Sequence, residues 1–209
     1  MDYKKFQAYQ NRALATVYEE GEDSFHNNII VALAEKYLAQ LHIPTTAAIL
    51  DIGCGAGAFI ETAQNLGYKN VTGVTLSEQD AETCRSKGFV SVTADMSDLP
   101  FDDALVDFVW CRHALEHSPY PLFTLYEFYR VMKPNALIYI DVPAPDNERI
   151  MLGEYNANHY SILGENMWLA LFMKAGFEIV ATEGYGLDVD QLGKIWKERC
   201  YVFVVRKPA

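Results

Sequence analysis

The sequence predicts an α/β protein built on an open, mostly parallel sheet with helices on both faces. Strand-like and helix-like segments alternate along most of the 209 residues, which is typical of a parallel sheet. The apolar run of residues 47–52 leads directly into three glycines at alternate positions, Gly53, Gly55 and Gly57. A glycine-rich turn between strand and helix lets a ligand approach the main chain closely. The pattern therefore predicts a nucleotide-type site at the end of the first strand.

Hydrophobic periodicity assigns the elements in chain order. Two helices precede the sheet, over residues 2–19 and from a cap at residue 23 or 24 to Pro44. Strands are predicted at residues 47–52, 70–75, 89–94, 105–111, 136–142, 177–183 and 200–206. Helices between them are predicted at residues 57–66, 77–88, 119–132 and 161–175. Residues 188–198 are expected to be partly helical at best, so the last two strands lack a full crossover helix.

Capping residues support several of these bounds. Ser77 followed three residues later by Asp80 is typical of a capping box. The pair Ser118-Pro119 combines an N-cap residue with a first-turn proline, and Ser161 is the predicted cap of the last helix.

The glycine loop fits two different ligand-binding patterns. Gly53-x-Gly55-x-x-Ala58 matches the dinucleotide fingerprint, which needs an acidic residue near the end of the next strand to hold the ribose. The same letters also match D-x-G-x-G-x-G, with Asp51 two residues before the first glycine. A tight turn without a ligand is the structural alternative, and three glycines make that turn costly.

The stretch LDIGCGAG, residues 50–57, resembles motif I of the class I S-adenosylmethionine-dependent methyltransferases. The resemblance is clear over residues 45–145 and looser as far as Arg206. It implies a Rossmann-like sheet of seven strands, mostly parallel, whose last strand is inserted antiparallel as a hairpin with the one before it. It also implies S-adenosylmethionine as the cofactor and S-adenosylhomocysteine as its product.

The resemblance further implies where the cofactor binds. The glycine loop would wrap around the methionine part, and the segment after the fourth strand would lie beside the amino and carboxylate groups. The Asp95 carboxylate would accept a hydrogen bond from the adenine amine, and the Met96 N–H would donate to a ring nitrogen; a solvated loop aspartate is the alternative. The full set of predicted cofactor-binding residues is Asp51, Gly53, Cys54, Gly55, Gly57, Thr75, Leu76, Asp95, Met96, Arg112 and His113.

The chain departs from the family at the ribose position. Where the family has an acidic residue at the end of the second strand, this chain has Thr75. The hydroxyl can make one bond to the ribose, and Glu78 or Gln79 is expected to supply another. The missing acid counts equally against an NAD site.

Residues 113–117, HALEH, also fit the H-x-x-E-H pattern of inverted zinc peptidases. Zinc chemistry would need both histidines on one helix facing the ion, together with a further ligand. The segment instead follows a strand directly and precedes a new helix, and it resembles the post-strand segment of small-molecule methyltransferases. We therefore expect no metal.

His113, His159 and Tyr160 are the candidate catalytic residues. His113 follows the carboxyl end of a predicted strand, where open α/β sheets bind their ligands. His159 and Tyr160 follow a polar loop that is expected to overhang the site, where they would orient or deprotonate a nucleophile. The structural alternatives are a packing role for His117 and an ordinary surface loop ending at the Ser161 cap.

The composition indicates which partners the protein is expected to bind and in which compartment it is expected to lie. The formal net charge of −11 disfavours nucleic acid, whose phosphates need a basic protein face. The four cysteines show no C-x-x-C pairing and no signal peptide is recognised, which predicts free thiols in the cytoplasm. The apolar runs are short, so no membrane span is expected.

These observations predict a single methyltransferase domain over residues 1–209. It would comprise an N-terminal helical cap (1–44), a cofactor-binding core (45–145) and a substrate-side segment with the terminal hairpin (146–209). The predicted reaction is methyl transfer to an O, N or C nucleophile of a small-molecule acceptor. The first alternative is an NAD(P)-dependent oxidoreductase, which the terminal hairpin and Asp95-Met96 disfavour. The second, a non-catalytic protein that binds the cofactor or its product, would retain the same residues. The acceptor and the oligomeric state are not predicted.

Overall fold

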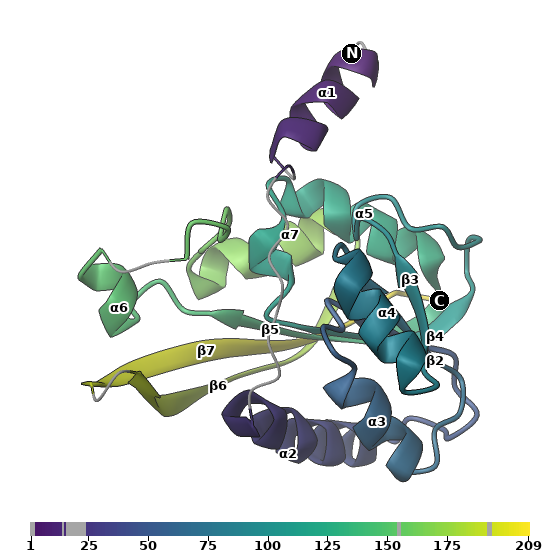
Figure 1. The fold of residues 1–209 in the computed structure, drawn as a ribbon. Coiled ribbons are helices and arrows are strands. Elements are labelled where there is room, and N and C mark those ends of the chain that lie inside the picture. Colours follow the sequence, from purple (N-terminus) through teal and green to yellow (C-terminus); the bar gives the residue numbers. More distant parts are fainter. Residues whose placement is uncertain (1–2, 14, 16–23, 154–155, 192–193) are drawn as a thin grey trace.

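The computed structural model describes residues 3–13, 15, 24–153, 156–191 and 194–209, and Figure 1 shows its fold. The strands are β1 (Ile49–Ile52), β2 (Val71–Thr75), β3 (Val90–Thr93), β4 (Val106–Arg112), β5 (Met132–Pro143), β6 (Glu178–Gln191) and β7 (Lys194–Arg206). The helices are α1 (Tyr3–Ala13), α2 (Ser24–Gln40), α3 (Ala58–Asn65), α4 (Glu78–Ser86), α5 (Pro121–Val131), α6 (Glu148–Met151) and α7 (Glu165–Ala175), with a 3₁₀ turn η1 (Leu115–His117).

All seven strands join one sheet in the order β3-β2-β1-β4-β5-β7-β6. The pairs among β1 to β5 are parallel, whereas β7 runs antiparallel to both β5 and β6. The sheet order reverses at β1 and β4, which places a crevice beside their carboxyl ends. The predicted fold, including the antiparallel terminal hairpin, is confirmed.

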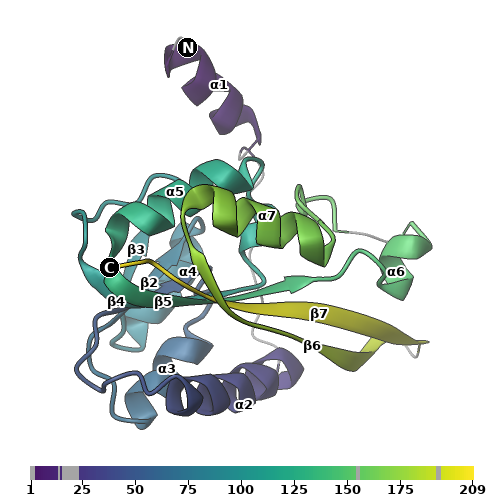
Figure 2. The same cartoon turned by 180° about the vertical axis from the view of Figure 1, so that it is seen from behind.

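The strand side chains alternate between two buried clusters, one on each face of the sheet. In β4, Val109 and Cys111 pack on the face covered by α5 and α7, while Phe108 and Trp110 pack on the face covered by α2 and α3 (Figures 1 and 2). Burying one such side chain contributes about 1.5–3 kcal/mol, so the two-sided pattern holds the sheet between its helices. Strands that are buried on both faces have nearly continuous apolar sequences. This is why β1 and β4 could be predicted from the sequence.

A stack of aromatic rings stiffens the α2 face of the sheet. The ring of Trp110 lies between Phe59 of α3 and Tyr139 of β5, with centroid distances of 4.5 and 4.1 Å. Tyr37 of α2 adds a tilted contact of 4.6 Å to Tyr139. This packing fixes α2 and α3 against the strands that end at the crevice.

The end of the chain corrects one expectation. Residues 188–191 and 194–198 are not partly helical, because they belong to the paired strands β6 and β7, in which Val189 pairs with Trp196 and Leu187 with Glu198. The period of two in Tyr185, Leu187 and Val189 is a strand signal. Helix α6, which was not predicted, lies near the far part of this hairpin (Figure 2).

Two predicted helix starts are also wrong. Helix α5 begins at Pro121, because the Ser118 hydroxyl bonds the Thr124 hydroxyl at 2.6 Å and does not cap a helix starting at Pro119. Helix α7 begins at Glu165, since the Ser161 hydroxyl donates to the Ser118 carbonyl oxygen at 2.9 Å.

Strand β5 starts at Met132, four residues before the predicted start, because Lys133-Pro134-Asn135 forms an irregularity in the pairing with β4 and does not end the strand. A proline is tolerated in such a bulge because no ladder hydrogen bond is needed from it. Within the described ranges, no helix is long and apolar enough to cross a membrane.

Candidate functional site

A pocket opens at the carboxyl edge of the sheet, where β1, β2, β3 and β4 end side by side. Ile52 and Val74 give it an apolar floor, and Asp80 and Asp95 bring carboxylates to its wall. Seven of the predicted cofactor-binding residues line it: Gly53, Gly55, Thr75, Leu76, Asp95, Met96 and His113. The candidate catalytic residue Tyr160 lines it as well.

The glycine loop adopts the left-handed backbone that its sequence permits. Gly53 and Gly55 have φ angles of 74° and 48°, a region that other residues enter only with strain. A Cβ on Gly53 would lie 2.7 Å from the Cβ of Ala114, so the loop packs directly on the segment after β4. Gly57 does not line the pocket; its φ is 89°, and a Cβ there would lie 2.9 Å from the Phe89 ring. Gly57 therefore determines the shape of the glycine loop without contacting the pocket.

Asp51, Cys54 and Arg112, the other predicted cofactor-binding residues, line a second, smaller pocket. The two pockets share Gly53 and Gly55, and the second also contacts α2. Asp51 and Arg112 are buried, with 3% and 8% of their surface exposed. The predicted set thus divides between two neighbouring pockets that meet at the glycine loop.

Thr75, the residue predicted to meet the ribose, lines the pocket and already has a hydrogen-bond partner in the protein. The Thr75 hydroxyl already accepts a hydrogen bond from the Ser77 N–H at 3.2 Å. The Ser77 hydroxyl accepts from the Asp80 N–H at 3.1 Å, which confirms the predicted helix cap. This cap starts α4 so that Asp80 turns inward, and its buried side chain lines the pocket.

Glu78 and Gln79, which were expected to assist Thr75, both point to solvent. Glu78 accepts a hydrogen bond from Arg85 at 2.5 Å and another from the Thr93 hydroxyl. Helix geometry explains the difference, since neighbouring positions of one helical turn point about 100° apart. The acid that reaches the pocket is Asp80, which our sequence reading treated only as part of a capping box.

Asp95 is held in place from two sides. Its Oδ1 accepts a hydrogen bond from the Ser97 N–H at 2.8 Å. Its Oδ2 accepts from the Gln10 side chain of α1, the helix that projects from the body in Figure 1. The carboxylate is therefore fixed at the pocket wall, as a hydrogen-bond acceptor for a ligand requires.

Beside the pocket, β4 and β5 carry a buried ion pair. Arg112 Nε lies 3.3 Å from Asp141 Oδ2, and the Tyr185 hydroxyl donates to the same oxygen at 2.6 Å. Asp141 is fully buried, and this burial raises its pKa to about 6, although Arg112 and Tyr185 oppose the shift. Removing either charged partner would strand the other in the protein interior.

His113 sits between this ion pair and the pocket. Its backbone is left-handed, with φ at 47°, and its ring nitrogens face protein atoms on both sides. Nδ1 lies 3.4 Å from Glu116 Oε1, and Nε2 lies 3.4 Å from Cys200 Sγ. Burial and the Arg112 charge hold the pKa of His113 well below its ordinary value, so the ring is neutral near pH 7.

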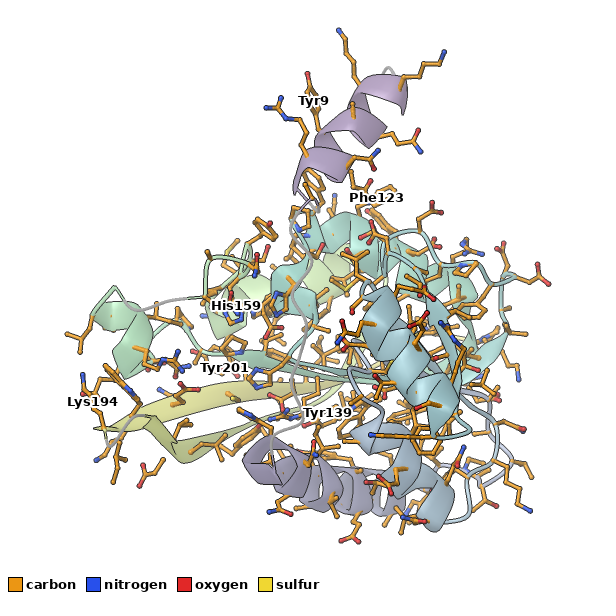
Figure 3. All side chains as sticks on the ribbon, in the orientation of Figure 1. Tyr9, Phe123, Tyr139, His159, Lys194 and Tyr201 are labelled. Carbon is orange, nitrogen blue, oxygen red and sulfur yellow. The ribbon has the colours of Figure 1, made fainter. Side chains whose placement is uncertain are left out.

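Two histidines meet beside the pocket, and of the two only His117 lines it. His117 lines the pocket, and its Nδ1 donates to the Asn158 carbonyl oxygen at 3.0 Å, a bond that leaves the lone pair on Nε2. The His159 ring, labelled in Figure 3, meets it edge-on with centroids 4.7 Å apart. Burial, with a further contribution from His117, lowers the pKa of His159 to about 4.

One carboxylate that lines the pocket, that of Asp80, was not predicted to contact the ligand. Asp80 lies five residues after Thr75, and the predicted cap at Ser77 fixes its helical phase. That phase alone does not show which side of α4 faces the pocket, because the packing of α4 on β2 and β3 decides it. His117 was expected either to meet the ligand or to pack structurally; it lines the pocket, and its contact with Asn158 joins residues 41 positions apart.

The chain is similar to known proteins in sequence and in fold. Residues 50–140 match the family described as a methyltransferase domain. The chain is 26% identical over 194 residues to the 27-O-demethylrifamycin SV methyltransferase of Amycolatopsis mediterranei, covering 83% of this chain and 68% of that protein. It is 36% identical over 114 residues to the O-methyltransferase cnsE of Penicillium expansum, covering 47% of this chain and 41% of that protein.

The fold is also that of solved relatives. A SAM-dependent methyltransferase from Archaeoglobus fulgidus superposes with a TM-score of 0.68 at 19% identity, covering 99% of this chain and all of that one. The two curated relatives share the core but are longer than this chain, which spans 68% and 41% of their lengths.

Proposed function

We propose that the chain is a class I, S-adenosylmethionine-dependent methyltransferase that transfers a methyl group from this cofactor to a hydroxyl oxygen of a small organic acceptor. The observation that carries the proposal is the pocket at the carboxyl edge of the sheet. It joins a glycine loop, two carboxylates and His117 in one space, and the His159 ring packs edge-on against His117. S-adenosylhomocysteine would be the product.

The charges of the two pockets fit the parts of this cofactor. In the larger pocket, Asp95 would accept from the adenine amine, and Asp80 would accept from the ribose hydroxyls in place of the acid missing at Thr75. In the smaller pocket, Asp51 and Arg112 would bind the ammonium and carboxylate of the methionine part. The Gly53 and Gly55 main chain would lie against the cofactor between them.

The bound cofactor supplies an electrophilic methyl group on a sulfonium. The protein would accelerate its transfer chiefly by holding the acceptor oxygen in line and by excluding water. His159, with its neighbour His117, would take the acceptor proton, since both rings are neutral near pH 7. His113 would form the pocket wall, because both of its ring nitrogens face protein groups, and Tyr160 would orient the acceptor.

A hydroxyl acceptor is favoured by one observation, and the pKa of His159 bears on the kind of hydroxyl. The relatives named above are, by name, an O-methyltransferase and an enzyme of a 27-O-demethyl compound. A histidine base with a pKa of about 4 is a weak proton acceptor, which suits a phenolic or enolic hydroxyl better than an alcohol. A small molecule in the cytoplasm also suits the acidic chain and its four buried free thiols.

The test is turnover with methyl-labelled S-adenosylmethionine and a panel of phenols, hydroquinones, aliphatic alcohols and amines. We expect label in a phenolic or enolic product, with Gly55→Val as the inactive control. Label transferred only to nitrogen or carbon would refute the acceptor class. Tight binding of S-adenosylhomocysteine without any turnover would favour a non-catalytic binding protein.

A further inference from the structure

Three side chains from distant parts of the sequence meet beside the pocket. His113 follows β4, Asp141 lies in β5, and Cys200 lies in β7, which pairs with β5. His113 Nε2 is 3.4 Å from Cys200 Sγ and 3.8 Å from Asp141 Oδ1, and all three donor atoms lie within 4.8 Å of one another. Asp141 and Cys200 are almost fully buried, at 0% and 1% exposed. The cluster is therefore enclosed on the β5 and β7 side.

The remaining polar side-chain atoms of Asp141 and His113 already contact other side chains. These contacts fix the orientation of the two residues. Asp141 Oδ2 receives the Tyr185 hydroxyl and faces Arg112, which leaves Oδ1 turned toward His113 and Cys200. His113 Nδ1 faces the Glu116 carboxylate, which accepts hydrogen bonds and so favours the proton on Nδ1. The lone pair of His113 then lies on Nε2, directed into the cluster.

The cluster has more acceptors than protons. His113 Nε2 and Asp141 Oδ1 are both acceptors in this arrangement, and only the Cys200 thiol can donate between them. The thiol proton can satisfy one of them and not both. Asp141 Oδ1 is buried and has no hydrogen-bond partner among the described residues. A buried oxygen left in this way destabilises the folded chain unless another group satisfies it.

We propose that His113, Asp141 and Cys200 bind a divalent transition-metal ion, with Zn²⁺ as the best fit. Imidazole nitrogen, carboxylate oxygen and thiolate sulfur are the three donor types that zinc accepts. At bond lengths of about 2.0–2.3 Å, a tetrahedral zinc ion separates its donors by about 3.3–3.6 Å. The His113–Cys200 and His113–Asp141 separations of 3.4 and 3.8 Å are close to that spacing. The contacts of Glu116, Tyr185 and Arg112 would orient the ligands from outside.

This site differs from the H-x-x-E-H motif that the sequence displays. His113 and His117 of that motif belong to separate clusters, and His117 groups with Glu116 and His159 instead. That second group lacks a thiolate and lies at the proposed base of methyl transfer. The metal site therefore uses His113 with two residues that the motif does not contain. Three protein donors leave one position of a tetrahedral ion for a non-protein ligand.

The test uses Co²⁺ as a spectroscopic probe on the full chain, purified after treatment with a chelator. Tetrahedral Co²⁺ bound by a thiolate gives a charge-transfer band in the near ultraviolet and strong visible bands. We expect one equivalent of Co²⁺ to produce both, and Zn²⁺ to displace it. Zinc affinity, measured against a chromogenic chelator, should fall in Cys200→Ser by more than the roughly 10–100-fold that losing an outer partner costs.

Matched variants separate this site from the alternatives. Cys84→Ser removes a buried thiol that contacts Cys54 and is not part of the proposed site. This variant should keep the thiolate band. His117→Ala disrupts only the second group and should keep it as well. Asp141→Asn keeps the shape of the side chain and should weaken zinc binding, with circular dichroism and thermal melting confirming that each variant is folded.

Three outcomes would overturn the proposal. The first is the absence of a thiolate band when the folded chain is saturated with Co²⁺. The second is a band that survives Cys200→Ser and disappears in Cys84→Ser, which would place the ion at the other thiol pair. The third is zinc binding that only His117→Ala removes. None of these readouts depends on methyl transfer, so failure of the metal site and failure of the proposed reaction are separable.

Discussion

Replacing Asp80 with asparagine tests whether this acid holds the ribose. Asp80→Asn keeps the size of the side chain and the main-chain N–H that the Ser77 hydroxyl caps, so α4 should still start at the same place. A hydrogen bond to a charged group contributes about 1.5–3 kcal/mol. Since about 1.4 kcal/mol is a tenfold change, the dissociation constant of S-adenosylhomocysteine should rise about 10- to 150-fold.

Glu78→Gln is the matched control. It removes the same charge from the same helical turn, but Glu78 is exposed and bonded to Arg85 and Thr93, so affinity should stay unchanged. Calorimetric titration of both variants measures the difference. The 2′-deoxy analogue of S-adenosylhomocysteine provides a second test. It should bind the wild-type chain more weakly than S-adenosylhomocysteine does, and this difference in affinity should be smaller in Asp80→Asn. Unchanged affinity in Asp80→Asn, or an equal loss in Glu78→Gln, would refute the assignment.

Four further changes test other parts of the account. Gly55→Val should abolish S-adenosylhomocysteine binding while circular dichroism remains native, because a branched side chain at a φ of 48° fills the cofactor space; retained affinity would contradict this. Asp95→Ala should weaken binding by about 1–3 kcal/mol in the same titration, and an unaltered dissociation constant would move the adenine site elsewhere. His159→Ala should lower kcat much more than cofactor affinity, and full turnover would remove it as the base. Because the pKa of His159 is lowered to about 4 from an ordinary 6.5, the unfolded chain binds the extra proton between these values. The contribution of His159 to stability is therefore present above pH 6.5 and lost as the pH falls to 4; His159→Asn should flatten that part of a denaturation-versus-pH curve, and an identical curve would contradict it.

Local sequence signals account for the parts of the fold and site that could be predicted. Three features could be predicted from short contiguous stretches without the rest of the chain: the glycine loop, the strand before it and Asp95-Met96. The same holds for the Ser77 cap, where a side chain bonds the main chain three residues on. Apolar runs revealed β1 and β4 because both of their faces are buried.

The parts that could not be predicted depend on long-range packing or on helical phase. Asp80 was overlooked because the side of α4 facing the pocket is fixed only once α4 packs on β2 and β3. The contact between His113 and Cys200 joins residues 87 positions apart, through the insertion of β7 beside β5. Ser118 looked like a helix cap, yet its hydroxyl pairs with Thr124, a choice that tertiary packing makes.

The central claim is that the pocket at the carboxyl edge binds S-adenosylmethionine. Calorimetric titration of the purified chain with S-adenosylhomocysteine, with NAD as a parallel titrant, tests it most directly. The account predicts saturable binding of S-adenosylhomocysteine, with a dissociation constant on the order of micromolar or about −8 kcal/mol, and no binding of NAD. Binding of NAD alone, or of neither compound, would contradict it.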